Sequence, residues 1–197
     1  MKTLFKALVL TATLSLVTIP AQAAIRVYTA VLNGASEAPP NASPGTGFTI
    51  VTVDDVLNTM RVQVTFTGLT GLTTNTHIHA ATAVAFTGTA GVATSTPTFA
   101  GFPAGVTSGT YDNTLDMTMA SSFNGAYITA NGGTTTTAFS ALRTALNTNT
   151  AYLNIHSTAF GGGEIRGFLV AAPEPTPFVL MGLGGVAGLA LRRRRRA

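Results

Sequence analysis

The chain has 197 residues and no cysteine, so it is long enough for one ordinary domain with targeting segments, and it cannot form disulfides, thiolate metal sites or a cysteine nucleophile. Its formal net charge is +4, but seven of the 11 basic residues stand near the two ends, as Lys2, Lys6 and the arginine run 192–196. The part between carries four arginines against six acidic residues, which leaves no basic face for phosphates and excludes nucleic acid as a partner.

The first 23 residues predict a secretory signal peptide. Lys2 and Lys6 form a positive n-region, residues 7–19 form an apolar h-region, and Pro20 ends it. Small residues favour cleavage after Ala23, with Ala24 as the alternative. The apolar run is short for a spanning helix, so export through the Sec pathway is favoured over a membrane anchor.

From residue 25 the pattern is typical of β-strands. Residues 25–32 are rich in β-formers and end at the turn signal Asn33-Gly34, and a Pro/Gly loop follows over 37–47. Residues 48–53 predict a second strand. In 60–66 apolar and polar residues alternate, which predicts a strand with one buried face. A turn at 68–72 leads into a strand over 76–79.

The second half of the chain is poorer in signals. Residues 80–113 predict loops with short strands near 91–94, and the alternation in 115–119 predicts another strand. Residues 138–146 predict one short helix. The last two strands, 152–156 and 164–170, are linked by the glycine turn 161–163. Short strands with turn signals and one helix predict an all-β, antiparallel, Greek-key-like β-sandwich or barrel.

A different module begins at Pro173-Glu174-Pro175. An apolar, glycine-dotted stretch over 178–191 precedes the five arginines, which predicts a short membrane segment followed by a cytoplasmic charge cluster. The stretch is short for a hydrocarbon core of roughly 30 Å, which fits a transient inner-membrane anchor better than a permanent one. This order resembles the PEP-CTERM sorting signal. The resemblance implies that an exosortase-type enzyme processes the tail during delivery to the cell surface or extracellular matrix.

All three histidines lie in strand-like segments. His77 and His79 are two residues apart and project from one face, opposite Ile78. His156 shares a face with Tyr152 and Asn154. If the two strands are neighbours, three imidazoles converge on a site suited to copper or zinc. The alternative is that the histidines hydrogen-bond loop carbonyls and bind no cofactor.

Glu164 and Arg166 also share a strand face. Two interpretations stand: a pair that steers an anion or binds a partner, and, as the favoured one, an ion pair that braces the glycine hairpin. A Ser/His/Asp hydrolase is excluded, because Ser157 faces away from His156 and no Gly-X-Ser-X-Gly elbow occurs.

Four segments together resemble the CHRD domain: the stretch YTAVLNGASEAPP at 28–40, FTGLTG at 66–71, THIH at 76–79, and YLNIHS with GGEIRG within 152–167. They span nearly the whole predicted mature chain. The resemblance implies a β-rich extracellular module, with no particular reaction attached to it.

The histidine segments also resemble, more distantly, copper/zinc superoxide dismutases. That resemblance implies copper ligands at His77, His79 and His156 and an anion-steering role for Arg166. The chain departs from those enzymes because it lacks a bridging histidine, the zinc-site cluster and the structural disulfide. A three-histidine copper site is the part of the resemblance that survives.

The sequence thus predicts an exported protein of a Gram-negative bacterium with a signal peptide (1–23), a CHRD-like domain (24–172) and a sorting signal (173–197). The favoured function is a non-catalytic matrix or envelope module that binds an extracellular polysaccharide or a surface protein. The alternative is a mononuclear copper protein.

Overall fold

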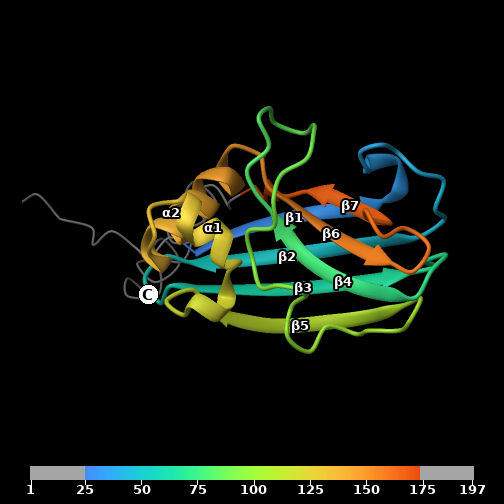
Figure 1. Ribbon diagram of the computed structural model, residues 1–197, viewed down its shortest axis with the longest axis horizontal. Coiled ribbons are helices and arrows are strands. Elements are labelled where there is room, and N and C mark those ends of the chain that lie inside the picture. Colours follow the sequence, from blue (N-terminus) through green and yellow to red (C-terminus); the bar gives the residue numbers. More distant parts are fainter. Residues whose placement is uncertain (1–24, 174–197) are drawn as a thin grey trace, which may run out of the picture.

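The computed structural model describes residues 25–173, which form one antiparallel sheet of eight strands with two helices. The strand order is β4-β6-β7-β1-β2-β3-β5, and β8 pairs with β1 (Figure 1). The strands are β1 (Ile25–Asn33), β2 (Thr46–Asp54), β3 (Thr59–Thr67), β4 (Thr73–His79), β5 (Gly109–Asp116), β6 (Tyr152–Ser157), β7 (Ile165–Phe168) and β8 (Val170–Ala171).

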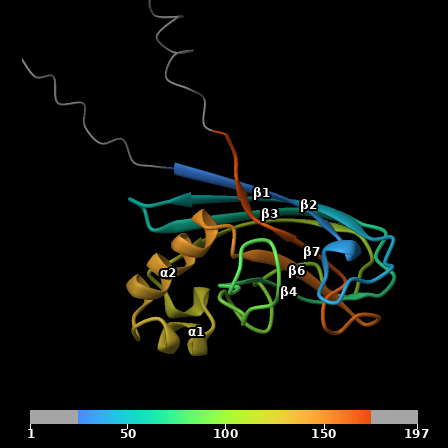
Figure 2. The ribbon, with the colours of Figure 1, turned by 90° about the horizontal axis from the view of Figure 1, so that it is seen from above.

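The sheet curls into a half-barrel, so that its two halves face each other. Figure 2 shows β1, β2 and β3 in one layer and β4, β6 and β7 in the other. The predicted all-β, antiparallel class is therefore confirmed, and the two facing layers are the two halves of one continuous sheet.

The core lies between these two halves, where apolar residues alternate along each strand. In β3 the predicted alternation is confirmed, because Met60, Val62, Val64 and Phe66 are buried while their neighbours are not. The opposite half contributes inward residues that are fully buried: Ile78, Leu153, Ile155 and Ile165. Each such side chain contributes roughly 1.5–3 kcal/mol when it leaves water.

Helices α1 (Gly125–Ala130) and α2 (Thr135–Asn147) lie at one end of the sheet (Figure 2). Thr134 begins α2 with a capping box to Thr137, and Leu142 and Leu146 face the core. The helix predicted over 138–146 is confirmed and extends further at its start. The expectation of a single helix is wrong, because Asn124 caps the short helix α1. Two 3₁₀ turns, η1 (Gly34–Ser36) and η2 (Ala120–Ser122), complete the elements.

Two predicted strands differ from the structure. The strand expected over 115–119 instead ends at Asp116, since its carboxylate accepts hydrogen bonds from Thr118 and turns the chain there. Met119 is consequently exposed. The segment near 91–94 forms only isolated bridges, His79 with Val92 and Thr94 with Phe123.

The predicted signal peptide, with its cleavage site at Ala23, lies outside the described residues, as does the sorting segment beyond Pro173. Within residues 25–173, no helix combines the length and apolar character needed to cross a membrane.

The curl of the sheet depends on a close approach of β7 to β1. The two strands pair only at Asn33 and Arg166, and β8 takes over further along at Tyr28 and Thr29. Between these points Gly167 lies directly against the backbone of β1, where an added Cβ would collide with the carbonyl oxygen of Val31 and lie 3.0 Å from the Cβ of Ala30.

We therefore expect Gly167→Ala to lower the free energy of unfolding by about 2–3 kcal/mol, because the backbones of β1 and β7 must move apart to admit a methyl group. Urea unfolding measures the change. Gly91→Ala is the matched control, since nothing lies within 4 Å of a Cβ at that position. Equal stability of the two variants would contradict this account of the curl.

Candidate metal centre

The three histidines lie on the outer face of the half-sheet formed by β4, β6 and β7. In the pairing of β4 with β6, His77 lies opposite Asn154 and His79 lies opposite Tyr152. Ile78 and Leu153 point the other way, into the core. The two strands are therefore neighbours, as the convergence of the imidazoles requires.

This outer face is polar, yet it is almost completely buried. Tyr152, Asn154, Arg166 and His77 are at most 5% exposed, and His79 and His156 are 9% exposed. Loops formed by residues 34–41, 80–91 and 158–163 supply hydrogen-bond partners to it. The half-sheet is thus apolar on its inner side and carries a sheltered polar layer on its outer side.

The imidazoles form one compact cluster. Ring centroids lie 4.7 Å apart for His77 and His79, 4.8 Å for His77 and His156, and 6.1 Å for His79 and His156. One ring nitrogen of each histidine lies within 4.8 Å of the other two. Three atoms this close share a central point at most about 2.8 Å from each, not far above the ~2 Å of an imidazole–metal bond.

Hydrogen bonds to loop carbonyls orient two of the rings. Nδ1 of His79 donates to Ala90 O at 2.8 Å, and Nδ1 of His156 donates to Gly161 O at 2.9 Å. A carbonyl oxygen can only accept, so the proton of each neutral ring resides on Nδ1 and Nε2 keeps a free lone pair.

The cluster therefore presents buried nitrogen atoms without partners. Nε2 of His79, Nε2 of His156 and Nδ1 of His77 are all buried and make no hydrogen bond. Unpaired buried polar atoms are rare in native proteins and call for an explanation such as a bound ion or water. Three of them from three converging imidazoles form a donor set that fits a transition-metal ion.

The surroundings hold the imidazoles in the neutral state that metal binding needs. Burial, together with the neighbouring His79 and His156, lowers the pKa of His77 from 6.5 to about 3. Burial also lowers the pKa of His79, to about 4, and that of His156, although the carbonyl hydrogen bonds oppose the change. At neutral pH the three imidazoles are therefore uncharged, as metal binding requires.

An aromatic and cationic stack adjoins the cluster. The ring of Tyr152 lies 4.7 Å from that of His79 and within 5° of parallel to it. The guanidinium carbon of Arg166 lies 4.7 Å from the centre of the Tyr152 ring. This stack limits the movement of the His79 ring and brings a buried positive charge near the cluster.

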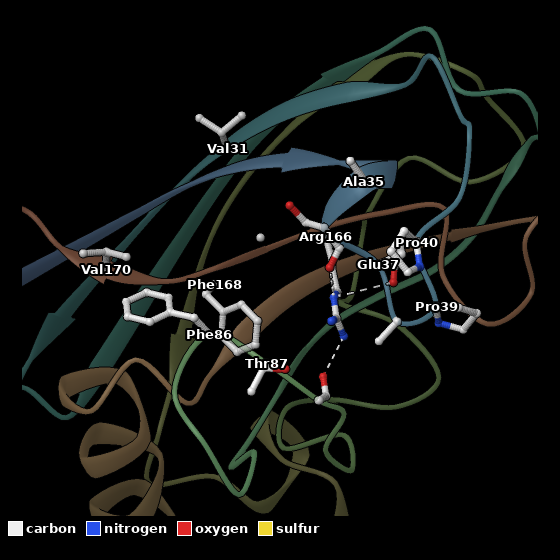
Figure 3. A pocket seen from close by; sticks show the side chains of 14 residues that line it. Val31, Ala35, Glu37, Pro39, Pro40, Phe86, Thr87, Arg166, Phe168 and Val170 are labelled. Atoms are coloured by element: carbon white, nitrogen blue, oxygen red, sulfur yellow. Dashed lines mark hydrogen bonds and ion pairs between the residues drawn. The ribbon is translucent and has the colours of Figure 1, made fainter.

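Arg166 connects the sheet to two of the covering loops. Its guanidinium donates from Nε to Ser36 O and from Nη1 to Gly88 O, and Nε lies 3.8 Å from the Glu37 carboxylate. Figure 3 shows Arg166 and Glu37 pointing toward each other. Because Arg166 is 3% exposed, little of it is open to an incoming anion.

The expected Glu164–Arg166 ion pair is not formed, which corrects the sequence-based interpretation. Glu164 accepts hydrogen bonds from Ser43 Oγ at 2.6 Å, from Thr70 N and from Gly71 N. It stands just before β7, which begins at Ile165, so the alternation of strand faces does not extend to it. Glu164 braces the turn that precedes β4.

Sequence reasoning missed Glu37 as a member of this layer, and it placed Asn154 on the face of His156 without assigning it a role. Burial raises the pKa of Glu37 from 4.5 to about 7, with Arg166 opposing the change. Oε1 of Glu37 and Oδ1 of Asn154 are buried without partners, and both lie close to Gly163. The available signals were a lone acid in a proline-rich segment and a polar residue two positions before His156.

Comparison with known proteins agrees with the sequence resemblances. The family model for the CHRD domain matches residues 28–169, and that for the PEP-CTERM protein-sorting motif matches residues 171–195. Neither the curated proteins nor the solved structures contain a match to the chain.

The low histidine pKa values predict a loss of stability in acid. In the metal-free protein the unfolded histidines bind protons below about pH 6.5, whereas folded His77 and His79 remain neutral down to about pH 3 and 4. The unfolded state therefore binds more protons, and the free energy of unfolding falls as the pH drops through this window, by up to about 1.4 kcal/mol per pH unit for each histidine.

His77→Gln removes one of these groups and should make the decline with pH shallower than in the parent. Urea unfolding of both metal-free proteins between about pH 7 and pH 4.5 measures the difference. Glu37 has a raised pKa, so its contribution to the free energy of unfolding increases as the pH falls. Glu37 is present in both proteins, and its contribution cancels in the comparison. Parallel curves would show that His77 is not held neutral.

Proposed function

The chain belongs to the CHRD-domain family, and from that premise we propose that its domain is a non-catalytic module that holds one transition-metal ion, copper or zinc. The ligands are His77, His79 and His156. The observation that carries the proposal is the convergence of three buried imidazoles, each with a buried ring nitrogen that lacks a hydrogen-bond partner.

The PEP-CTERM motif places this domain on an exported protein that is sorted to the cell surface of a Gram-negative bacterium, and an exosortase is the enzyme that recognises the motif. An ion held there is held outside the cytoplasm. We further propose that the tail from Pro173 is processed during delivery and that the mature chain begins after Ala23.

A holding function suits the site better than catalysis. The imidazoles are less than one-tenth exposed, so a substrate would reach a bound ion only after the covering loops moved. The neighbouring ionisable groups are also engaged: Arg166 donates to loop carbonyls, and the Glu37 carboxylate lies 3.8 Å from Arg166 Nε. Two fixed rings favour a site that binds an ion and keeps it.

A second candidate function is binding of an extracellular polysaccharide at a cavity next to the metal centre. The cavity of about 600 Å³ is lined by Phe168, Arg166, Glu37 and the prolines 39 and 40 (Figure 3). At its rim Phe86 is 56% exposed and has a φ of 63°, a conformation uncommon for an aromatic residue. An exposed aromatic ring beside a polar floor suits the apolar face and hydroxyls of a sugar.

The metal proposal predicts stoichiometric loading. The protein is incubated separately with Zn(II), with Cu(II) and, under anaerobic conditions, with Cu(I), and free ion is removed; elemental analysis should find one ion per purified protein chain for at least one of the three. His77→Ala and His156→Ala should each lower retention by at least about 100-fold, because a three-ligand site loses a third of its donors. Thr76→Val is the matched control, since it alters the neighbouring inward-facing position of the same strand. Metal at background level in the parent protein would refute the proposal.

The polysaccharide proposal predicts that Phe86→Ser weakens co-sedimentation with matrix polysaccharide from the producing bacterium by about 5- to 10-fold, since an aromatic contact contributes roughly 1 kcal/mol. Phe48→Ser is the matched control, because Phe48 is 45% exposed on the outer face of β2. A parent protein that does not co-sediment, or equal losses in both variants, would argue against this cavity.

A further inference from the structure

The charge of the metal centre differs from that of most sites for divalent ions. Within residues 25–173 the ligand group consists of three imidazoles and contains no carboxylate. Histidine binds a metal as a neutral ligand. The closest charged neighbours are Arg166 and its partner Glu37, which at most cancel each other. The ligands and their neighbours therefore add no net negative charge to offset that of a bound ion.

Burial makes this lack of negative charge costly for a divalent ion. The rings are less than one-tenth exposed, so water screens a bound ion poorly. The penalty for placing an ion in a medium of low dielectric grows with the square of its charge, and it is therefore about fourfold greater for a divalent than for a monovalent ion. Anionic ligands usually offset that penalty, and here none is present among the ligand group.

The low number of ligands also disfavours a divalent ion. Zn(II) prefers four tetrahedral ligands, and Cu(II) prefers a square-planar or tetragonal set. The cluster supplies three nitrogens, two of them on rings whose orientation is fixed by carbonyl hydrogen bonds. Cu(I) is commonly two- or three-coordinate, so three nitrogens satisfy it, whereas they leave Zn(II) and Cu(II) one ligand short of the sets they prefer.

The positive charge of Arg166 also affects which ion the cluster binds. Its guanidinium carbon and the His79 ring lie 4.7 Å from the same Tyr152 ring centre, which puts the cation within about 10 Å of the cluster. A unit charge at that distance in a protein interior changes the binding of a second unit charge by roughly 20-fold. The guanidinium therefore disfavours a divalent ion more than a monovalent one.

We infer that the three-histidine cluster selects the monovalent ion Cu(I) over the divalent ions Zn(II) and Cu(II). The inference rests on the proposed metal-binding function and adds the identity and oxidation state of the ion. It arises from neutral ligands, burial, a low ligand number and a neighbouring cation.

Competition experiments on the full-length protein in detergent test the selectivity. Under anaerobic conditions, Cu(I) is supplied from a chromophoric Cu(I) chelator, and Zn(II) and Cu(II) are supplied in parallel from chelators of known affinity. We expect one equivalent of Cu(I) to be retained at least about 100-fold more tightly than either divalent ion. Admitting air to the loaded protein should release the copper, because dioxygen accepts one electron from each Cu(I) and leaves the disfavoured Cu(II).

Asn154→Asp tests the charge argument directly. Asn154 lies opposite His77 on β6, so the isosteric aspartate places a negative charge beside the cluster. We expect the preference for Cu(I) over Zn(II) to fall by about tenfold or more. Asn113→Asp is the matched control, because it makes the same change on β5, in the other half of the sheet, and should leave the preference unchanged.

Each outcome bears on a different claim. If Zn(II) or Cu(II) binds the parent protein as tightly as Cu(I), the selectivity is refuted while the metal-binding function stands. If no ion is retained under any condition, both fall. If Asn154→Asp fails to fold, the parent competition alone still decides the selectivity.

Discussion

The structure depends on the burial of a polar layer on the outer face of β4, β6 and β7. A buried polar group without a hydrogen bond costs roughly 1–3 kcal/mol, so each one requires a partner. Three loops provide partners from their backbone carbonyls: Ser36 and Gly88 to Arg166, Ala90 to His79, and Gly161 to His156. The side chains that form the layer are therefore also the anchors of the loops that cover it.

Parts of this arrangement could be predicted from sequence because they depend on local periodicity. Alternation identified the inward residues of β3, and the two-residue spacing put His77 and His79 on one face, as the structure has them. The adjacency of β4 and β6 could only be stated as a condition, since 72 residues separate His79 from Tyr152 and strand order is a property of the whole sheet.

The partners of the charged residues could not be predicted, because they come from loops. Arg166 meets Glu37, which is distant in sequence, while Glu164 turns to Ser43 and the backbone of the turn before β4. Face sharing on one strand suggested a Glu164–Arg166 pair, yet the strand begins only at Ile165. Burial of the outer face could not be predicted from the sequence either, because a Thr- and Gly-rich loop carries no signal of which surface it covers.

The hydrogen bonds of the layer also determine how much order a metal ion would have to impose. Immobilising a free side chain costs about 0.5–1.5 kcal/mol, and His79 and His156 are already held by carbonyls and, for His79, by the ring of Tyr152. Only His77 lacks a hydrogen bond at its buried Nδ1. Folding therefore already fixes two of the three rings. The entropic cost that weakens the binding of an ion comes from restricting the His77 ring alone.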